Sequence, residues 1–120
     1  MELIRKACVK TLRNPGVESA QLLNPENSKS ERITITRVRV ESGAEQGRHC
    51  HDSSEQIWIA LKGKGKLLLA DGKEEDFSEG DTVRFADGDI HGLKNDSGEL
   101  FEYISVTSPP INFSYAYKNK

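Results

Sequence analysis

Short apolar segments separated by glycine-containing turns run through this chain and restrict it to a β fold. In residues 32–40 (RITITRVRV) the side chains alternate, with Ile33 and Ile35 on one face and threonines and valines on the other. Further segments of strand length follow at 57–61, 66–70, 83–85, 90–93 and 100–106. Closely spaced short strands of this kind are typical of a sandwich or barrel rather than a parallel sheet. We therefore expect an all-β domain.

The turns and the chain ends complete the predicted organisation. Asp71 and Gly72 after an apolar segment predict a hairpin turn. Residues 1–31 are expected to supply an N-terminal strand and a loop, the loop at 22–29 (LLNPENSK). Two prolines end the last strand, so residues 111–120 are expected to form a loosely held tail. We interpret residues 1–120 as a single domain.

Size and charge exclude several kinds of partner. A chain of 120 residues is long enough to bury a core without disulfides. Its 17 basic and 19 acidic residues are mixed along the sequence, so no basic stripe predicts binding to nucleic acid or to an anionic membrane. No apolar run approaches the ~18 residues of a membrane span, and the N-terminus lacks the apolar core of a signal peptide. We expect a cytoplasmic protein in which Cys8 and Cys50 are reduced.

All three histidines of the chain fall in two glycine-framed segments. His49 and His51 lie in GAEQGRHCHDSSEQIWIALKG, and His91 lies in GDTVRFADGDIHGLKN. On a strand, His49 and His51 would face the same side and Cys50 the other, so the two imidazoles could reach one ion. Imidazole is the commonest protein ligand of transition metals. The pattern therefore predicts a site for one divalent metal ion.

The two segments resemble the two signature motifs of the cupin superfamily. The first motif corresponds to residues 43–63 and the second to residues 80–95. The agreement rests on Gly43, His49, His51, Gly63, Gly80, Gly88, His91 and Asn95. The resemblance implies a small jelly-roll barrel, also called a double-stranded β-helix, with a divalent metal in its interior. This chain departs from the second motif at Ala86, where the family usually has proline.

The fourth ligand is the second departure from the family pattern. Counted back from Gly63, the position of the usual glutamate ligand is Gln56, and Glu55 lies one residue earlier. A shift of one residue reverses the face of a strand, so both cannot coordinate without a bulge. The resemblance favours Gln56 beside the three histidines, with Glu55 as the alternative ligand or as a carboxylate next to the ligands. An amide ligand leaves one more unit of positive charge in the site, worth about 4 kcal/mol at 4 Å and an effective dielectric near 20.

Further residues of the two motifs and the last strand are expected around the metal. Four side chains are expected to line a substrate pocket or to pack in the core beside it: Trp58, Leu93, Phe101 and Tyr103. Tyr103 and Glu55 are the candidate acids, and no other catalytic residue is identified. The positions expected to serve the backbone are Gly43, Gly63, Gly80, Gly88 and Asn95, with Asn95 closing a turn.

Metal-assisted chemistry on a small molecule is the predicted function. Four protein ligands on a six-coordinate ion leave two positions for a hydroxy acid, keto acid or enediol, which suits an isomerase, lyase or decarboxylase. An iron-dependent dioxygenase is an alternative enzyme, and a non-catalytic metal or ligand sensor is an alternative of another class. The ligand types do not choose among Fe, Mn, Ni, Zn and Cu. The family resemblance also implies a homodimer, for which Ile33 and Ile35 offer an outer apolar patch.

Overall fold

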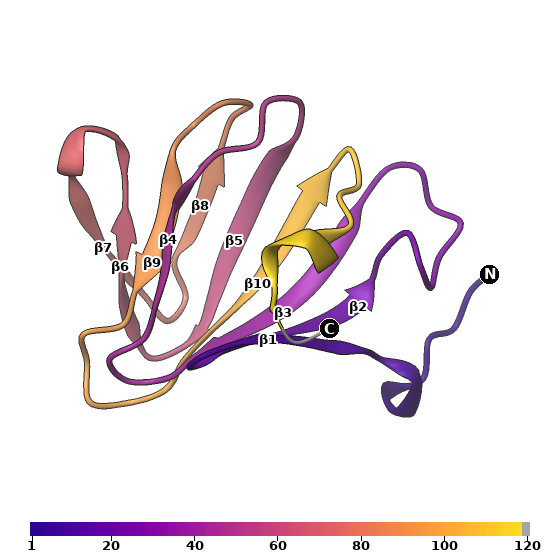
Figure 1. The fold of residues 1–120 in the computed structure, drawn as a ribbon, viewed down its shortest axis with the longest axis horizontal. Helices are drawn as coiled ribbons and strands as arrows, with labels where there is room; N and C mark the ends of the chain where they lie inside the picture. The colour runs from indigo at the N-terminus through magenta and orange to yellow at the C-terminus, as the bar shows by residue number, and fades with distance from the viewer. Residues whose placement is uncertain (119–120) are drawn as a thin grey trace.

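Two antiparallel sheets face each other in the computed structural model, which describes residues 1–118 (Figure 1). The larger sheet has six strands in the order β1-β2-β3-β10-β5-β8, and the smaller has four in the order β4-β9-β6-β7. The strands are β1 (Thr11–Asn14), β2 (Val17–Leu23), β3 (Thr34–Val40), β4 (Glu45–His49), β5 (Glu55–Lys62), β6 (Lys64–Leu68), β7 (Glu74–Ser78), β8 (Thr82–Phe85), β9 (His91–Lys94) and β10 (Phe101–Ser108). Short 3-10 turns η1 (Lys6–Cys8), η2 (Ala70–Gly72) and η3 (Phe113–Ala116) complete the fold. The predicted all-β double-stranded β-helix is confirmed.

Alternation along the strands decides which side chains enter the barrel. In β3, Thr36 and Val38 are buried while Arg37 and Arg39 are exposed, so the threonine and valine face is the interior one. At one end of the larger sheet the interior is apolar, with Val17, Val40 and Phe101 paired across neighbouring strands. Towards the other end the inward side chains of β3 and β10 become threonine and serine. The barrel therefore has an apolar floor and a polar upper interior.

The predicted hairpin is confirmed, and the N-terminal prediction is corrected. Asp71 and Gly72 adopt φ of 60° and 70° and join β6 to β7. Residues 1–31 contain two strands rather than one, because a turn at Gly16 pairs β1 with β2. The loop begins at Asn24, since β2 continues through Leu23. The mixed sequence of β2 (VESAQLL) hides this strand from a reading based on alternation alone.

The prediction that residues 111–120 form a loosely held tail is wrong for residues 111–118, the part that the structure describes. Tyr117 is only 8% exposed and belongs to the hydrophobic core cluster. Two hydrogen bonds fix the segment to the N-terminal hairpin, from Asn14 Nδ2 to the Ala116 carbonyl (3.0 Å) and from the Lys118 N–H to Asn14 Oδ1 (2.9 Å). The η3 turn lies beside β10 and β3 in Figure 1. Residues 119–120 lie outside the described part of the chain.

The outer face of the larger sheet carries the apolar side chains that the interior does not use. Ile35, Val106 and Ile57 form one outward row across β3, β10 and β5, and Ile104 pairs with Ile59 in the next row. This face supports the expected homodimer, which stays a prediction. Among residues 1–118, no helix is long and apolar enough to span a bilayer.

Replacing Tyr117 by alanine should destabilise the fold. Removing a buried aromatic side chain leaves a cavity and costs roughly 3 kcal/mol. Urea denaturation should therefore show a lower free energy of unfolding for Tyr117→Ala than for the parent protein. Tyr115→Ala is the matched control, because Tyr115 is 67% exposed and should change stability by less than about 0.5 kcal/mol. Equal effects of the two substitutions would contradict the packed position of Tyr117.

Candidate metal centre

The three histidines meet at one place between β4 and β9. One ligand atom from each of His49, His51 and His91 lies within 4.8 Å of the others. The ring centroids are 4.3 Å apart for His49 and His91, 5.2 Å for His49 and His51, and 5.3 Å for His51 and His91. No carboxylate or thiol of the described residues joins this group. The convergence predicted from the two motifs is confirmed.

A bulge in β4 brings His49 into this cluster. Gln46 pairs with Leu93 and His49 pairs with His91, so β4 carries one residue more than β9 between these two pairs. The extra residue turns His49 to the same side as Gln46. The close approach of the bulge requires glycine at position 92, where a Cβ would lie 2.7 Å from the Gln46 carbonyl oxygen. β4 ends at His49, so the expectation that His49 and His51 share one strand is wrong, although their rings still converge.

The hydrogen bonds of the rings orient the free nitrogens. The Nδ1 atoms of His49 and His91 lie 2.9 Å from the carbonyl oxygens of Gly47 and Asp89. Because a carbonyl oxygen only accepts, each Nδ1 carries the proton and each Nε2 keeps its lone pair. Nε2 of His51 and Nε2 of His91 are buried and have no hydrogen-bond partner. Buried acceptors are rarely left unpaired, and a metal ion would satisfy both.

Burial also keeps the imidazoles in the form that binds metal. It lowers the pKa of His91 to about 4, and the neighbouring His49 and His51 add to the effect. Burial lowers the pKa of His51 as well. Phe85 stacks on the His91 ring at 4.5 Å and 14°, which contributes to this apolar environment. Both buried histidines are therefore neutral at pH 7, and the residues fit a metal ion.

The loop before His91 accommodates the departure from the family pattern. The Ala86 N–H donates to Asp89 Oδ2 at 2.8 Å, a hydrogen bond that proline could not make. Asp89 in turn supplies the carbonyl that holds the His91 ring. In this chain the hydrogen bond from Ala86 therefore restrains the loop, where a proline ring would restrain it in other family members.

The two candidates for a fourth ligand lie on opposite faces of β5. Gln56 is buried and lines the same cavity as His49 and His51. Its Nε2 donates to Thr107 Oγ1 (2.9 Å), and its Oε1 accepts from Trp58 Nε1 (3.2 Å), which leaves one lone pair on that oxygen. The Glu55 carboxylate accepts from Arg84 Nε at 2.8 Å and is not in the histidine group.

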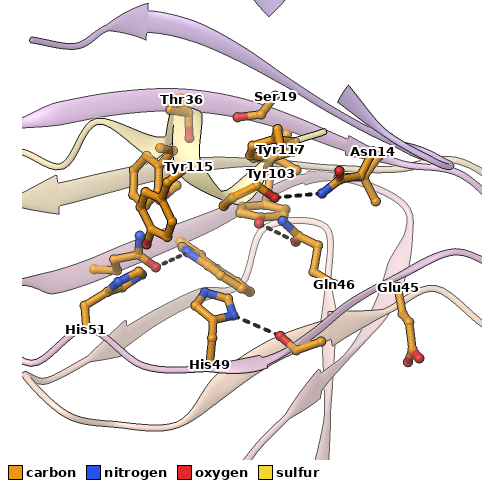
Figure 2. A pocket seen from close by; sticks show the side chains of 18 of the residues that line it. Asn14, Ser19, Thr36, Glu45, Gln46, His49, His51, Tyr103, Tyr115 and Tyr117 are labelled. Carbon is orange, nitrogen blue, oxygen red and sulfur yellow. Dashed lines mark hydrogen bonds between the residues drawn. The ribbon is translucent and has the colours of Figure 1, made fainter. Parts of the chain in front are cut away.

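A cavity of about 400 Å³ opens beside the histidines (Figure 2). Trp58 and Tyr103 line it as expected. Leu93 and Phe101 do not line it, which corrects the predicted pocket, because both are fully buried at the apolar floor and pack against Gly65. Five further wall residues were not expected from the sequence: Gln46, which lies three residues before His49, and Ser19, Thr36, Ser105 and Tyr117, which lie outside the two motifs. Alternation along the strands could have identified two of these residues, because Thr36 lies on the same face of β3 as Val38 and Ser105 lies on the same face of β10 as Tyr103.

Tyr103 is held as a proton donor inside the cavity. Its hydroxyl donates to Gln46 Oε1 at 2.6 Å. Burial raises the pKa of Tyr103 well above its usual value, and burial also raises the pKa of Tyr117. Tyr103 therefore remains protonated at neutral pH.

The residues expected to have structural roles in turns are found in those roles. Asn95 is fully buried, and its Nδ2 donates to the carbonyls of Val40 (2.9 Å) and Glu99 (2.7 Å) while Oδ1 accepts from Ser97. The predicted glycines adopt positive φ at turns: Gly43, Gly63, Gly80 and Gly88. At Gly63 a Cβ would also lie 2.5 Å from the Leu100 carbonyl oxygen, so no other residue fits.

Alkaline titration should reveal the buried tyrosines. Because unfolding exposes Tyr103 and Tyr117, the unfolded chain ionises near pH 10 while the folded chain keeps both protons. The free energy of unfolding should therefore fall as the pH rises above 10. Ultraviolet absorbance should show tyrosinate from Tyr103 only well above pH 10 and from Tyr117 at a pH above the usual range, and Tyr103→Phe should remove the later signal. Full ionisation of all three tyrosines near pH 10 in a folded protein would be inconsistent with this site.

Known proteins share this fold and this sequence pattern. Residues 36–107, more than half of the chain, match the sequence model of the family described as "Cupin domain". An oxalate-binding protein of Thermotoga maritima is 27% identical over 90 residues, which cover 75% of this chain and 74% of that protein. The structure of KdgF from a Halomonas species superimposes with a TM-score of 0.77 at 18% identity, over 93% of this chain and 96% of that one. A predicted oxalate decarboxylase from Thermotoga maritima gives a TM-score of 0.75 at 24% identity, over 89% of this chain and 98% of that one. The chain belongs to the cupin family.

Proposed function

We propose that this protein is a metal-dependent cupin enzyme that acts on a small carboxylate- or hydroxyl-bearing molecule by proton transfer. The observation that carries the proposal is the pair of buried, unpartnered Nε2 atoms of His51 and His91 beside His49. His49 and His51 also line a cavity of a size typical for small-molecule sites. The related oxalate-binding protein of Thermotoga maritima binds a carboxylate, which supports this class of ligand.

His49, His51, His91 and Gln56 would hold one divalent ion. Three imidazole nitrogens and an amide oxygen suit Fe, Mn, Ni, Zn or Cu. When bound, the ion would act as a Lewis acid that polarises a substrate oxygen and lowers the pKa of an adjacent C–H or O–H group. Because all four protein ligands are neutral, the site would favour an anionic substrate group.

Residues of the cavity wall would donate protons to the substrate and orient the metal ligands. Tyr103 keeps its proton because burial raises its pKa, so its hydroxyl could donate to a substrate oxygen in place of Gln46 Oε1. Trp58 holds the Gln56 oxygen through its indole N–H and so orients the fourth ligand. Phe113, whose ring lies 5.7 Å from the His51 ring, adds apolar surface to the cavity beside the histidines.

Metal content gives the first test of the site. Protein purified without added metal should contain roughly one divalent ion per chain by elemental analysis. His51→Ala and His91→Ala should lose most of it while the circular dichroism of the sheets is retained. Cys50→Ala is the matched control, because this exposed residue lies between two of the histidines and outside the ligand group. Retention of a full metal complement by both histidine variants would refute the site.

Proton transfer itself can be observed by exchange with solvent. The metal-loaded protein should incorporate deuterium from D₂O at the carbon next to the carboxylate in a panel of hydroxy and keto acids, followed by NMR. Exchange should depend on His91 and survive in Cys50→Ala. Binding of these acids without any exchange would instead indicate the non-catalytic binding module.

Adding a negative charge at the expected fourth ligand should weaken anion binding. Gln56→Glu adds a negative charge beside the metal, so the affinity for glycolate measured by calorimetry should fall by at least roughly tenfold. Glu55→Gln is the control, since Glu55 pairs with Arg84 on the other face of β5 and should not alter this affinity. A change for Glu55→Gln with none for Gln56→Glu would identify Glu55 as the ligand.

A further inference from the structure

We infer that the part of the cavity beyond the metal binds an uncharged, hydroxyl-bearing portion of the ligand, and that Ser105 and Thr36 recognise it. The inference deepens the proposed function and rests on it, because the histidine end is where the carboxylate of the ligand would bind. It assigns a substrate class, a carboxylate with a neutral polyhydroxyl chain.

Unpaired buried atoms point to this second contact. Among the described residues, four buried side-chain atoms lack a hydrogen-bond partner: His51 Nε2, His91 Nε2, Gln21 Oε1 and Ser105 Oγ. The two histidine atoms belong to the candidate metal centre. Gln21 and Ser105 remain, and both pair with Thr36, one from β2 and one from β10. The unpaired atoms therefore lie in one inward row that crosses the larger sheet.

This row faces the cavity with hydroxyl groups. Ser105 is 4% exposed, and it lines the cavity together with Thr36 and Ser19. Gln21 Nε2 donates to Ser19 Oγ at 2.9 Å, which orients the Ser19 side chain on this wall. Figure 2 shows Thr36 and Ser19 on the wall opposite His49. A ligand that reaches from the histidines across the cavity would meet these hydroxyls.

The described cavity wall has no positive side chain that could bind a second anionic group at the end of the ligand away from the histidines. No lysine or arginine of residues 1–118 lines the cavity. Arg37 and Arg39 pair with Glu102 on the outer face, and Arg48 Nε donates to the Leu69 carbonyl. A phosphate or second carboxylate at the hydroxyl wall would be buried without a counter-charge, which is costly. Neutral hydroxyls of a ligand can both donate to and accept from serine and threonine.

The remaining walls suit the carbon skeleton of such a chain. The aromatic rings of Trp58, Phe113, Tyr115 and Tyr117 border the same space. They offer apolar surface to C–H groups while the opposite wall offers hydroxyls. At about 400 Å³ the cavity has room for more than a two-carbon acid held at the metal alone.

Three α-hydroxy acids separate the contributions of the two ends. Gluconate, 2-hydroxyhexanoate and 6-phosphogluconate share the same chelating group and differ in the rest of the chain. On Zn²⁺-loaded protein, calorimetry should give an affinity for gluconate roughly tenfold higher than for 2-hydroxyhexanoate. The affinity for 6-phosphogluconate should be lower than that for gluconate by at least the same factor. Glycolate should bind through the metal alone.

Two variants assign the preference to the hydroxyl wall. Ser105→Ala and Thr36→Val should each reduce the affinity for gluconate about fivefold to tenfold and leave glycolate and 2-hydroxyhexanoate unchanged. Ser105→Ala should not lower the melting temperature, because it removes an unpaired buried hydroxyl. Ser108→Ala is the matched control on the outward face of the same strand and should change none of these affinities.

The outcomes distinguish this inference from the proposed function. Zn²⁺ and glycolate binding with equal affinities for gluconate and 2-hydroxyhexanoate would overturn the hydroxyl subsite and leave the metal site standing. Equal losses of gluconate and glycolate binding in Ser105→Ala would also overturn it, since the serine would then act on the metal end. A failure to bind Zn²⁺ would overturn both.

Discussion

The site depends on the pairing of β4 with β9. Without the extra residue in β4, His49 would lie on the opposite face from Gln46 and could not approach His91. The same bulge is possible only because Gly92 has no side chain to meet the Gln46 carbonyl. One irregular strand pair thus positions both His49, a candidate metal ligand, and Gln46, which accepts the hydrogen bond from Tyr103.

The larger sheet supplies a graded interior against this pair. Its floor is formed by Val40 and Phe101, which share the hydrophobic core with Leu93 of β9, and all three residues are fully buried. Above them the inward positions are hydroxyls and an amide, and Ser105 Oγ and Gln21 Oε1 are buried there without a hydrogen-bond partner. A fold that needs only part of its interior for stability can use the rest for binding.

The C-terminal segment converts an open barrel end into a cavity. Tyr117 enters the core from one side, and Asn14 holds the backbone of the segment through both its donor and its acceptor. The aromatic residues of this segment then border the hydroxyl wall on one side and His51 on the other. Residues from both ends of the chain therefore line the cavity together with residues of the first motif.

Local patterns in the sequence determined the β class, the hairpin at Asp71 and Gly72, the turn-closing Asn95 and the meeting of the three histidines. Each depends on residue type and on spacing within a strand or motif. Tertiary structure decided the bulge at His49, the choice of Gln56 rather than Glu55 as the residue that faces the cavity, the burial of Leu93 and Phe101 away from it, and the packing of Tyr117. These features depend on register between strands distant in sequence, and a one-residue shift in register reverses the face of every side chain in a strand. Alternation within one segment therefore identifies two faces but cannot state which partner each face will meet.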